Sequence, residues 1–177
     1  MQVLVNGIAW NKISFSGCSY GTCYRYFREL QRRGKLKLIF QILVGEKTDI
    51  KGLPVNVSFG KGGDDDRDFV PVHLQNGGRR RKIKTLNLDK GYTSCDLIRD
   101  LRRRGTSVNM QTKKGDYIRK IGPKFGFKEE KYKVRFLVEK VFTWMENFRH
   151  IKLRREYKPA MFKAFVYLSL MLILLRN

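Results

Sequence analysis

Residues 85–111, TLNLDKGYTSCDLIRDLRRRGTSVNMQ, contain two short apolar segments that flank an amphipathic stretch. The segments at 85–88 and 107–111 have the length and composition of strands. Between them, Ser94 is a typical N-cap and Gly105 a typical helix stop, so a helix is expected there. Its inner face is predicted to contain Leu97, Ile98 and Leu101. The order strand, helix, strand indicates an α/β or α+β layer fold.

Asp89 directly follows the first of these predicted strands and precedes Lys90, Gly91 and Tyr92. In α/β sheets, functional sites collect beyond the carboxyl ends of the strands, where loops present side chains to a ligand. A carboxylate in that position, beside a basic segment, is suited to hold a metal ion against a phosphate. The same residue is equally suited to cap a turn, and the spacing alone leaves both interpretations open.

The longest regular element is predicted at residues 130–150, where seven apolar residues fall on one side of a helix. These are Val134, Leu137, Val138, Val141, Phe142, Met145 and Phe148. A polar stripe at the edge of this face contains Tyr132, Arg135, Glu139 and Glu146. Glu139 is therefore the natural partner of Asp89 in a magnesium site, because two-metal phosphoryl transfer needs acids that hold two ions about 3.5–4 Å apart. The alternative is an ion pair between Glu139 and Arg135.

The net charge points to a polyanionic partner. Thirty-eight Lys and Arg face sixteen Asp and Glu, which gives a formal charge of +22. Self-repulsion at this charge opposes folding, so nucleic acid is the first expected partner and an anionic membrane surface the second. Between residues 79 and 104, ten basic residues face three acids, as expected of a phosphate-backbone contact. The predicted DNA contacts in this stretch are Arg79, Arg80, Arg81 and Lys82.

Other parts of the chain have weaker signals. Residues 1–45 are expected to be helical, with Thr22 as an N-cap and Gly34 as a C-cap. The interleaved arginines give this segment a cationic face, which suits DNA binding as well as plain solvation. Residues 52–59 start with turn residues and then alternate in polarity, which predicts a strand. Residues 61–68 are expected to form a polar loop.

The most apolar segment, residues 164–175, contains twelve residues including Ser169. A membrane-spanning helix needs roughly 20 apolar residues, so a buried helix or strand of the core is expected instead, and no membrane partner. Three cysteines at unrelated spacings, Cys18, Cys23 and Cys95, predict neither a disulfide framework nor a zinc site. With no targeting segment recognisable, the expected location is the cytoplasm.

Two motifs resemble those of a known family. Residues 88–92, LDKGY, closely resemble the DKGY block of insertion-sequence DDE transposases. Tyr132, Arg135 and Glu139 match the second signature of that family, which is a Tyr, two residues, an Arg, three residues and a Glu. Further similarities follow the order of the family at residues 6–10, 20–27, 51–55 and 162–176. The resemblance therefore extends along nearly the whole chain.

The resemblance implies a ribonuclease-H-like fold and magnesium-dependent cutting and joining of DNA at the terminal inverted repeats of an insertion sequence. Asp89 would be the second catalytic acid and Glu139 the third, and both would be ligands of Mg²⁺. Tyr132 and Arg135 would support Glu139 and contact DNA.

The first acid of the family has no counterpart in this sequence. In the family, that Asp lies on the opening strand of the catalytic domain, well before a Gly-Leu-Pro turn that resembles residues 52–54. Here Asp49 comes almost directly before the turn, which leaves too few residues for the strand and its partner. Asp64, Asp65 and Asp66 follow the turn in a predicted loop, where acidic residues are ordinary. A weakly held or absent metal pair is therefore expected.

A second departure lies seven residues after Glu139, where family members usually have a basic residue and this chain has Glu146. DNA contact is expected to be weaker there. Together the departures suggest an internally truncated transposase. Residues 1–45 would form a helical, DNA-binding-like segment, and residues 46–177 a ribonuclease-H-like domain that lacks its first strand or strands.

Two hypotheses of function follow. The first is an insertion-sequence transposase by descent, bound to the nucleoid and inactive for lack of the first Asp, with a homodimer as an open alternative. The second is a non-catalytic basic nucleic-acid-binding protein that competes with full-length transposase for its sites. A membrane-surface protein that uses the C-terminal apolar segment is a third, weaker reading.

Overall fold

The computed structural model describes residues 1–13, 17–47, 52–76, 83–111 and 127–176. They form two compact units, and each is described by itself. The helical unit consists of Met1–Val55 and Leu137–Asn177, and the mixed unit consists of Asn56–Phe136. The domain boundary expected near residue 45 stays a prediction.

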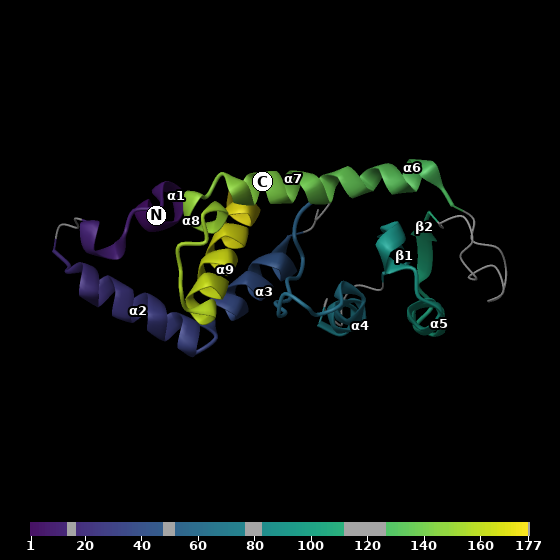
Figure 1. Ribbon diagram of the computed structural model, residues 1–177, viewed down its shortest axis with the longest axis horizontal. Helices are drawn as coiled ribbons and strands as arrows, with labels where there is room; N and C mark the ends of the chain where they lie inside the picture. Colours follow the sequence, from purple (N-terminus) through teal and green to yellow (C-terminus); the bar gives the residue numbers. More distant parts are fainter. Residues whose placement is uncertain (14–16, 48–51, 77–82, 112–126, 177) are drawn as a thin grey trace. The chain divides into compact units, whose positions relative to one another are not determined.

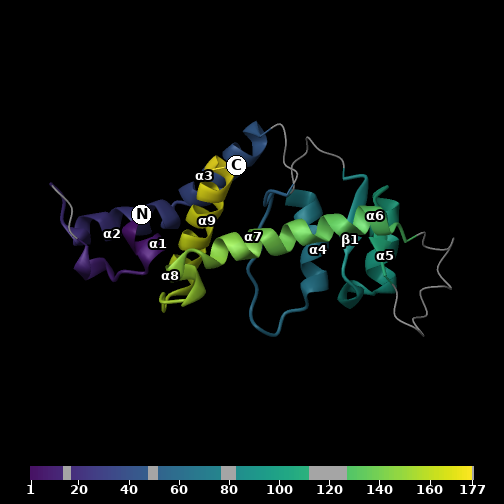
Figure 2. The same ribbon diagram turned by 90° about the horizontal axis from the view of Figure 1, so that it is seen from above.

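The helical unit is built around its last helix. Its elements are α1 (Gln2–Asn6), a 3₁₀ turn (Trp10–Lys12), α2 (Tyr20–Arg32), α3 (Lys35–Glu46), α7 (Phe136–Glu146), α8 (Arg149–Lys152) and α9 (Pro159–Arg176). Figures 1 and 2 both show α3 and α9 side by side. In α9, Phe165 and Leu174 are buried, and Phe165 lies 4.8 Å from Phe27 of α2 and 6.0 Å from Trp10, between ring centroids. Burial of this apolar surface is what holds the unit together.

The prediction that residues 164–175 form a buried element is confirmed. They lie within α9, and nine of its residues are buried. By length and composition α9 is also apolar enough to cross a membrane, with half of its residues buried in the structure.

The start of α2 differs by three residues from the prediction. Ser19, rather than Thr22, is the N-cap, and its Oγ accepts a hydrogen bond from the Thr22 N–H at 3.2 Å. Both residue types suit this role, and the hydroxyl that faces the first turn decides which one caps it. Gly34 follows the helix in a left-handed conformation with φ 66°, which glycine adopts without strain, as expected of a helix stop.

The mixed unit contains the only strands among the described residues. Its elements are α4 (Asp66–Asn76), β1 (Thr85–Leu88), a 3₁₀ turn (Lys90–Tyr92), α5 (Cys95–Arg103), β2 (Ser107–Met110), α6 (Glu129–Tyr132) and a second 3₁₀ turn (Lys133–Arg135). The strands are parallel, with Thr85 paired to Ser107 and Leu88 to Met110. Two parallel strands need a crossover connection, and α5 provides it. The core of the mixed unit consists of Val70, Leu88, Leu97, Ile98, Leu101, Val108 and Met110.

This β1–α5–β2 unit confirms the interpretation of residues 85–111. Ser94 caps α5 by accepting a hydrogen bond from the Leu97 N–H, and Gly105 follows the helix with φ 72°. The predicted inner face is the buried one, since Leu97 is 6% exposed and Ile98 and Leu101 are 0% exposed.

The prediction of a strand at residues 52–59 is wrong, because no described residue there joins a sheet. The Val57 N–H donates instead to Asn56 Oδ1 at 2.9 Å, a local bond that competes with a strand ladder. The polar loop predicted at residues 61–68 ends early, where α4 begins at Asp66. The helix α4 was not predicted from the sequence, and it contains Pro71, a residue type that usually breaks helices.

The helix predicted at residues 130–150 is shorter and less regular than expected. It begins as α6, tightens into the 3₁₀ turn Lys133–Arg135, continues as α7 and ends at Glu146. Phe148 is extended before α8 begins. No residue of α7 is buried, and Phe136 and Phe142 are 67% and 60% exposed, so the apolar stripe does not face a core in this structure.

Candidate functional site

Asp89 lies at the carboxyl end of β1, as predicted, directly after the buried Leu88. Its backbone is still extended, and it caps the 3₁₀ turn Lys90–Tyr92. Asp89 Oδ1 accepts a hydrogen bond from the Lys90 N–H at 2.7 Å. The capping role that the sequence left open is therefore real, and it fixes the carboxylate at the tip of the strand.

Arg135 lies next to this carboxylate. Its Nη1 is 3.4 Å from Asp89 Oδ1, and it donates a hydrogen bond to the Tyr132 hydroxyl at 2.9 Å. The guanidinium also lies 5.7 Å from the centre of the Tyr132 ring. We call Asp89, Tyr132 and Arg135 the polar cluster. Its ion pair is half exposed, with 40% of the Arg135 side chain and 50% of the Asp89 side chain accessible. Such a pair adds little to stability, so its effect is to orient the guanidinium.

Asn109 of β2 holds α6 against the strands. Its side chain is 4% exposed, and its Nδ2 donates to Asn87 Oδ1 of β1 at 2.8 Å and to the Lys128 carbonyl at 3.0 Å. Its Oδ1 accepts from the Lys128 N–H at 2.9 Å. One amide therefore joins both strands to the residue that precedes α6, and this positions Tyr132 and Arg135 near the end of β1. Sequence reasoning missed this residue, although asparagine is depleted in strands and was a usable signal.

Asn109→Leu is expected to lower the free energy of unfolding by about 2–3 kcal/mol, because a buried side chain loses three hydrogen bonds and its partners in both strands and before α6 are left unpaired. Chemical denaturation followed by circular dichroism measures this change. The exposed Asn147 offers a matched control, since Asn147→Leu removes no such network and should change stability by less than about 0.5 kcal/mol. Equal effects of the two substitutions would show that Asn109 does not hold α6.

Glu139 lies in α7, and its carbonyl accepts a hydrogen bond from Thr143 Oγ1 at 3.0 Å. Glu139 belongs to the helical unit, whereas Asp89 belongs to the mixed unit. The juxtaposition of the two carboxylates expected from the sequence stays a prediction.

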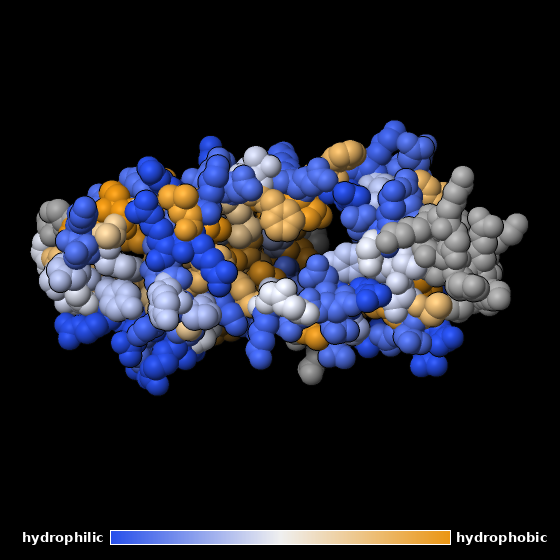
Figure 3. Space-filling model, in the orientation of Figure 1, coloured by the Kyte–Doolittle hydropathy of each residue, from blue (hydrophilic) through white to orange (hydrophobic). Residues whose placement is uncertain are grey.

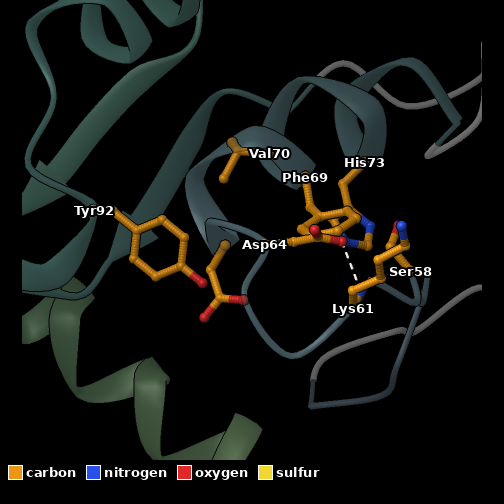
Figure 4. A pocket seen from close by; sticks show the side chains of 9 residues that line it. Ser58, Lys61, Asp64, Phe69, Val70, His73 and Tyr92 are labelled. Atoms are coloured by element: carbon orange, nitrogen blue, oxygen red, sulfur yellow. Dashed lines mark hydrogen bonds between the residues drawn. The ribbon is translucent and has the colours of Figure 1, made fainter.

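The acidic loop after residue 60 lies beside a hollow of about 350 Å³ in the mixed unit. It is lined by Ser58, Gly60, Lys61, Asp64, Asp66, Phe69, Val70, His73 and Tyr92. Figure 4 shows Tyr92 on one side of this hollow and Asp64, Phe69 and His73 on the other. Asp64 Oδ2 accepts a hydrogen bond from the Lys61 N–H at 2.6 Å, drawn as a dashed line. Asp65 is paired with Arg67, which lowers its pKa to about 2.

Tyr92 links this hollow to the motif at Asp89. Burial raises the pKa of the Tyr92 hydroxyl, and the negative charges of Asp66, Asp89 and Asp65 raise it further. Tyr92 therefore keeps its proton at neutral pH. The nearby acids do not complete a metal site: the described part of the chain contains no group of three His, Cys, Asp or Glu side chains that could hold an ion.

The basic residues predicted to bind DNA at positions 79–82 lie outside the described residues. Several described arginines pair locally along their helices. In α5, Arg99 pairs with Asp96 and Arg104 with Asp100, each at 2.8 Å. At the end of α2, the hydrogen bond from Arg32 has the largest effect on Glu29 and the one from Arg33 the next largest, and together they lower the pKa of Glu29 to about 2. Hydrophilic side chains cover much of the face shown in Figure 3, as the +22 charge leads one to expect.

The family model for the transposase DDE domain matches residues 41–175. The matched region includes the polar cluster, Glu139 and α9 as far as Leu175. No curated protein and no solved structure matches the chain.

Proposed function

Because the chain belongs to the transposase DDE domain family, we propose that it binds the DNA ends of an insertion sequence but is severely impaired in cutting and joining them. The family implies a ribonuclease-H-like fold, DNA as the partner and a divalent metal as the usual cofactor. The same proposal includes a ribonuclease-H-like domain that lacks its first strand. It also places the protein in the cytoplasm, bound to the nucleoid. The small described sheet of two strands is consistent with it.

The polar cluster is the observation that carries the DNA-binding part of this proposal. Arg135 presents a planar set of N–H donors, which suits the oxygens of a phosphate. Asp89 and Tyr132 contact this guanidinium on one side, and 40% of the Arg135 side chain is accessible. An arginine positioned in this way loses less side-chain conformational entropy when it contacts a phosphate.

The proposed impairment rests on the ligands that a metal pair requires. Asp89 and Glu139 would be the ligands, but the acid that comes first in the family is missing from the sequence. Asp89 Oδ1 already accepts from Lys90 and lies beside the positive charge of Arg135, which opposes a second cation at the same atom. The described residues therefore do not fit a two-metal centre, and no catalytic step is assigned to one.

The same observations favour the alternative of a non-catalytic competitor. An arginine that pairs with Asp89 and contacts a phosphate requires no metal. A chain that binds the terminal repeats without cutting them would reduce the access of an intact transposase to those repeats.

DNA binding is expected to be independent of divalent metal. Titration of the chain into a fluorescent duplex that carries the terminal repeat should give affinities within about twofold in magnesium and in excess chelator, because arginine–phosphate contacts need no metal. Ionic strength is matched between the two buffers, since salt alone changes the affinity. Loss of binding in chelator would contradict the proposal and point to an intact metal centre.

Arg135→Ala is expected to weaken DNA binding about tenfold, because one charge-assisted phosphate contact contributes on the order of 1–2 kcal/mol. The same titration measures it. Arg99→Ala is the matched control, because it removes the same charge from the same unit at an exposed arginine that pairs with Asp96. If both variants weaken binding equally, net charge alone explains the effect and the polar cluster has no special part.

A further inference from the structure

Cys18 and Cys23 lie together at the start of α2, which their spacing in the sequence did not predict. Their Sγ atoms are 3.3 Å apart. Cys18 is exposed and Cys23 is half-buried, and both are free thiols in this structure. Cys95, the third cysteine, is on α5 in the mixed unit.

The capping of α2 explains why these two sulfurs meet. Ser19 is the N-cap, so Cys18 precedes the cap and Cys23 is the fourth residue of the helix. Side chains at these two positions contact each other across the first turn, in the arrangement that apolar residues use to fix the entry of a chain into a helix. Here Ser19 Oγ also contacts Thr22 Oγ1 at 3.0 Å, which orders the turn between the two thiols.

We propose that Cys18 and Cys23 form a reversible dithiol–disulfide pair that closes over the N-terminus of α2. The bonded sulfurs of a disulfide lie about 2.0 Å apart, so each sulfur needs to move by less than about 1 Å from the observed contact. Side-chain rotation at the exposed Cys18 is sufficient for such a movement.

The reaction is thiol–disulfide exchange with a low-molecular-weight disulfide such as oxidised glutathione. The Cys18 thiolate attacks one sulfur of the small disulfide, forms a mixed disulfide and releases one small thiolate. The Cys23 thiolate then attacks Cys18 Sγ, which forms the Cys18–Cys23 bond and releases the second small thiolate. The two protons lost by the cysteines end on the two released thiols. The protein is oxidised by two electrons and the small disulfide is reduced by two.

The environment of the two thiols sets the order of these steps. Cys18 is the more exposed sulfur and is the one that a small disulfide reaches first. The hydrogen bond with Cys18 raises the pKa of the Cys23 thiol above its ordinary value of 9.0, so Cys23 keeps its proton longer. Each step needs a thiolate, so both are expected to accelerate as the pH rises toward the ordinary range of a cysteine pKa.

Oxidation of the full chain followed by mass spectrometry tests the proposal. The reduced protein is treated with oxidised glutathione at pH 8, and free thiols are then blocked with a maleimide before digestion. We expect a Cys18–Cys23 disulfide in most chains, while Cys95 carries the maleimide. Cys23→Ser should stop the reaction at the mixed disulfide on Cys18, and Cys95→Ser should change nothing. Separate labelling of Cys18 and Cys23 without a bond between them would overturn the proposal.

A denatured control separates the effect of the fold from that of closeness in sequence. In guanidinium chloride that unfolds the chain, at the same pH, closure of the mixed disulfide should be about tenfold slower, because the two sulfurs are no longer held in contact. Equal closure rates in the folded and unfolded chain would show that the start of α2 does not position the pair, and this too would overturn the proposal.

Discussion

The affinity of the chain for DNA is expected to fall about a thousandfold when the salt concentration rises from about 50 to about 200 mM, because phosphate contacts release condensed counterions. The +22 charge supports a contact with several phosphates. Titrations of a labelled duplex at four or five salt concentrations give the slope of log affinity against log salt. A loss of this size corresponds to roughly six phosphate contacts.

The slope also tests the place of Arg135 in the interface. If its guanidinium contacts one phosphate, Arg135→Ala should reduce the slope of log affinity against log salt by the amount expected for about one phosphate contact. Arg99→Ala should leave it unchanged when Arg99 stays paired with Asp96. A flat salt dependence of the unaltered chain would count against both the transposase and the competitor hypotheses, because each depends on contact with the phosphate backbone.

The parts of the fold that the sequence predicted correctly depend on local signals. Ser94 and Gly105 mark the two ends of α5, and the spacing of Leu97, Ile98 and Leu101 identifies its buried face. These signals act within a few residues, so no knowledge of the tertiary structure is needed. The first strand and the position of Asp89 at its end follow from the same stretch.

The errors arise where one residue outweighs a pattern. Alternating polarity predicted a strand at residues 52–59, but Asn56 satisfies a backbone N–H locally and no partner strand is present among the described residues. The helix α4 was not predicted, although Asp66 and Asp68 lie in its first turn, where acidic side chains interact favourably with the helix dipole. The periodicity at residues 130–150 was real, but it does not show where a helix ends.

The candidate site was predictable only as separate residues. Asp89 was identified from its place after a predicted strand, and Tyr132 and Arg135 from their resemblance to a transposase motif, whereas their contacts depend on Asn109, which joins β1, β2 and the start of α6. Such a network links residues far apart in the sequence, and periodicity carries no information about it. The contact between Cys18 and Cys23 is local, but it was also missed, because it depends on Ser19 rather than Thr22 as the cap.

DNA strand cleavage by this chain is expected to be at background. A two-metal mechanism needs carboxylates that bridge and hold both ions, and the groups of such a centre act as a unit, so loss of one removes on the order of 10³-fold or more of the rate. The proposal is that the first acid is missing here, and Asp89 shares its Oδ1 with the Lys90 N–H and Arg135. The expected result is therefore binding without turnover.

A cleavage assay on terminal-repeat DNA, with magnesium or manganese, shows whether the chain binds DNA without cutting it. We expect that product does not exceed the level seen in chelator, and that Asp89→Ala and Glu139→Ala leave this level unchanged while each variant still binds the duplex. Efficient metal-dependent cleavage that disappears in Asp89→Ala would overturn this expectation, because it would show a working metal centre that includes Asp89.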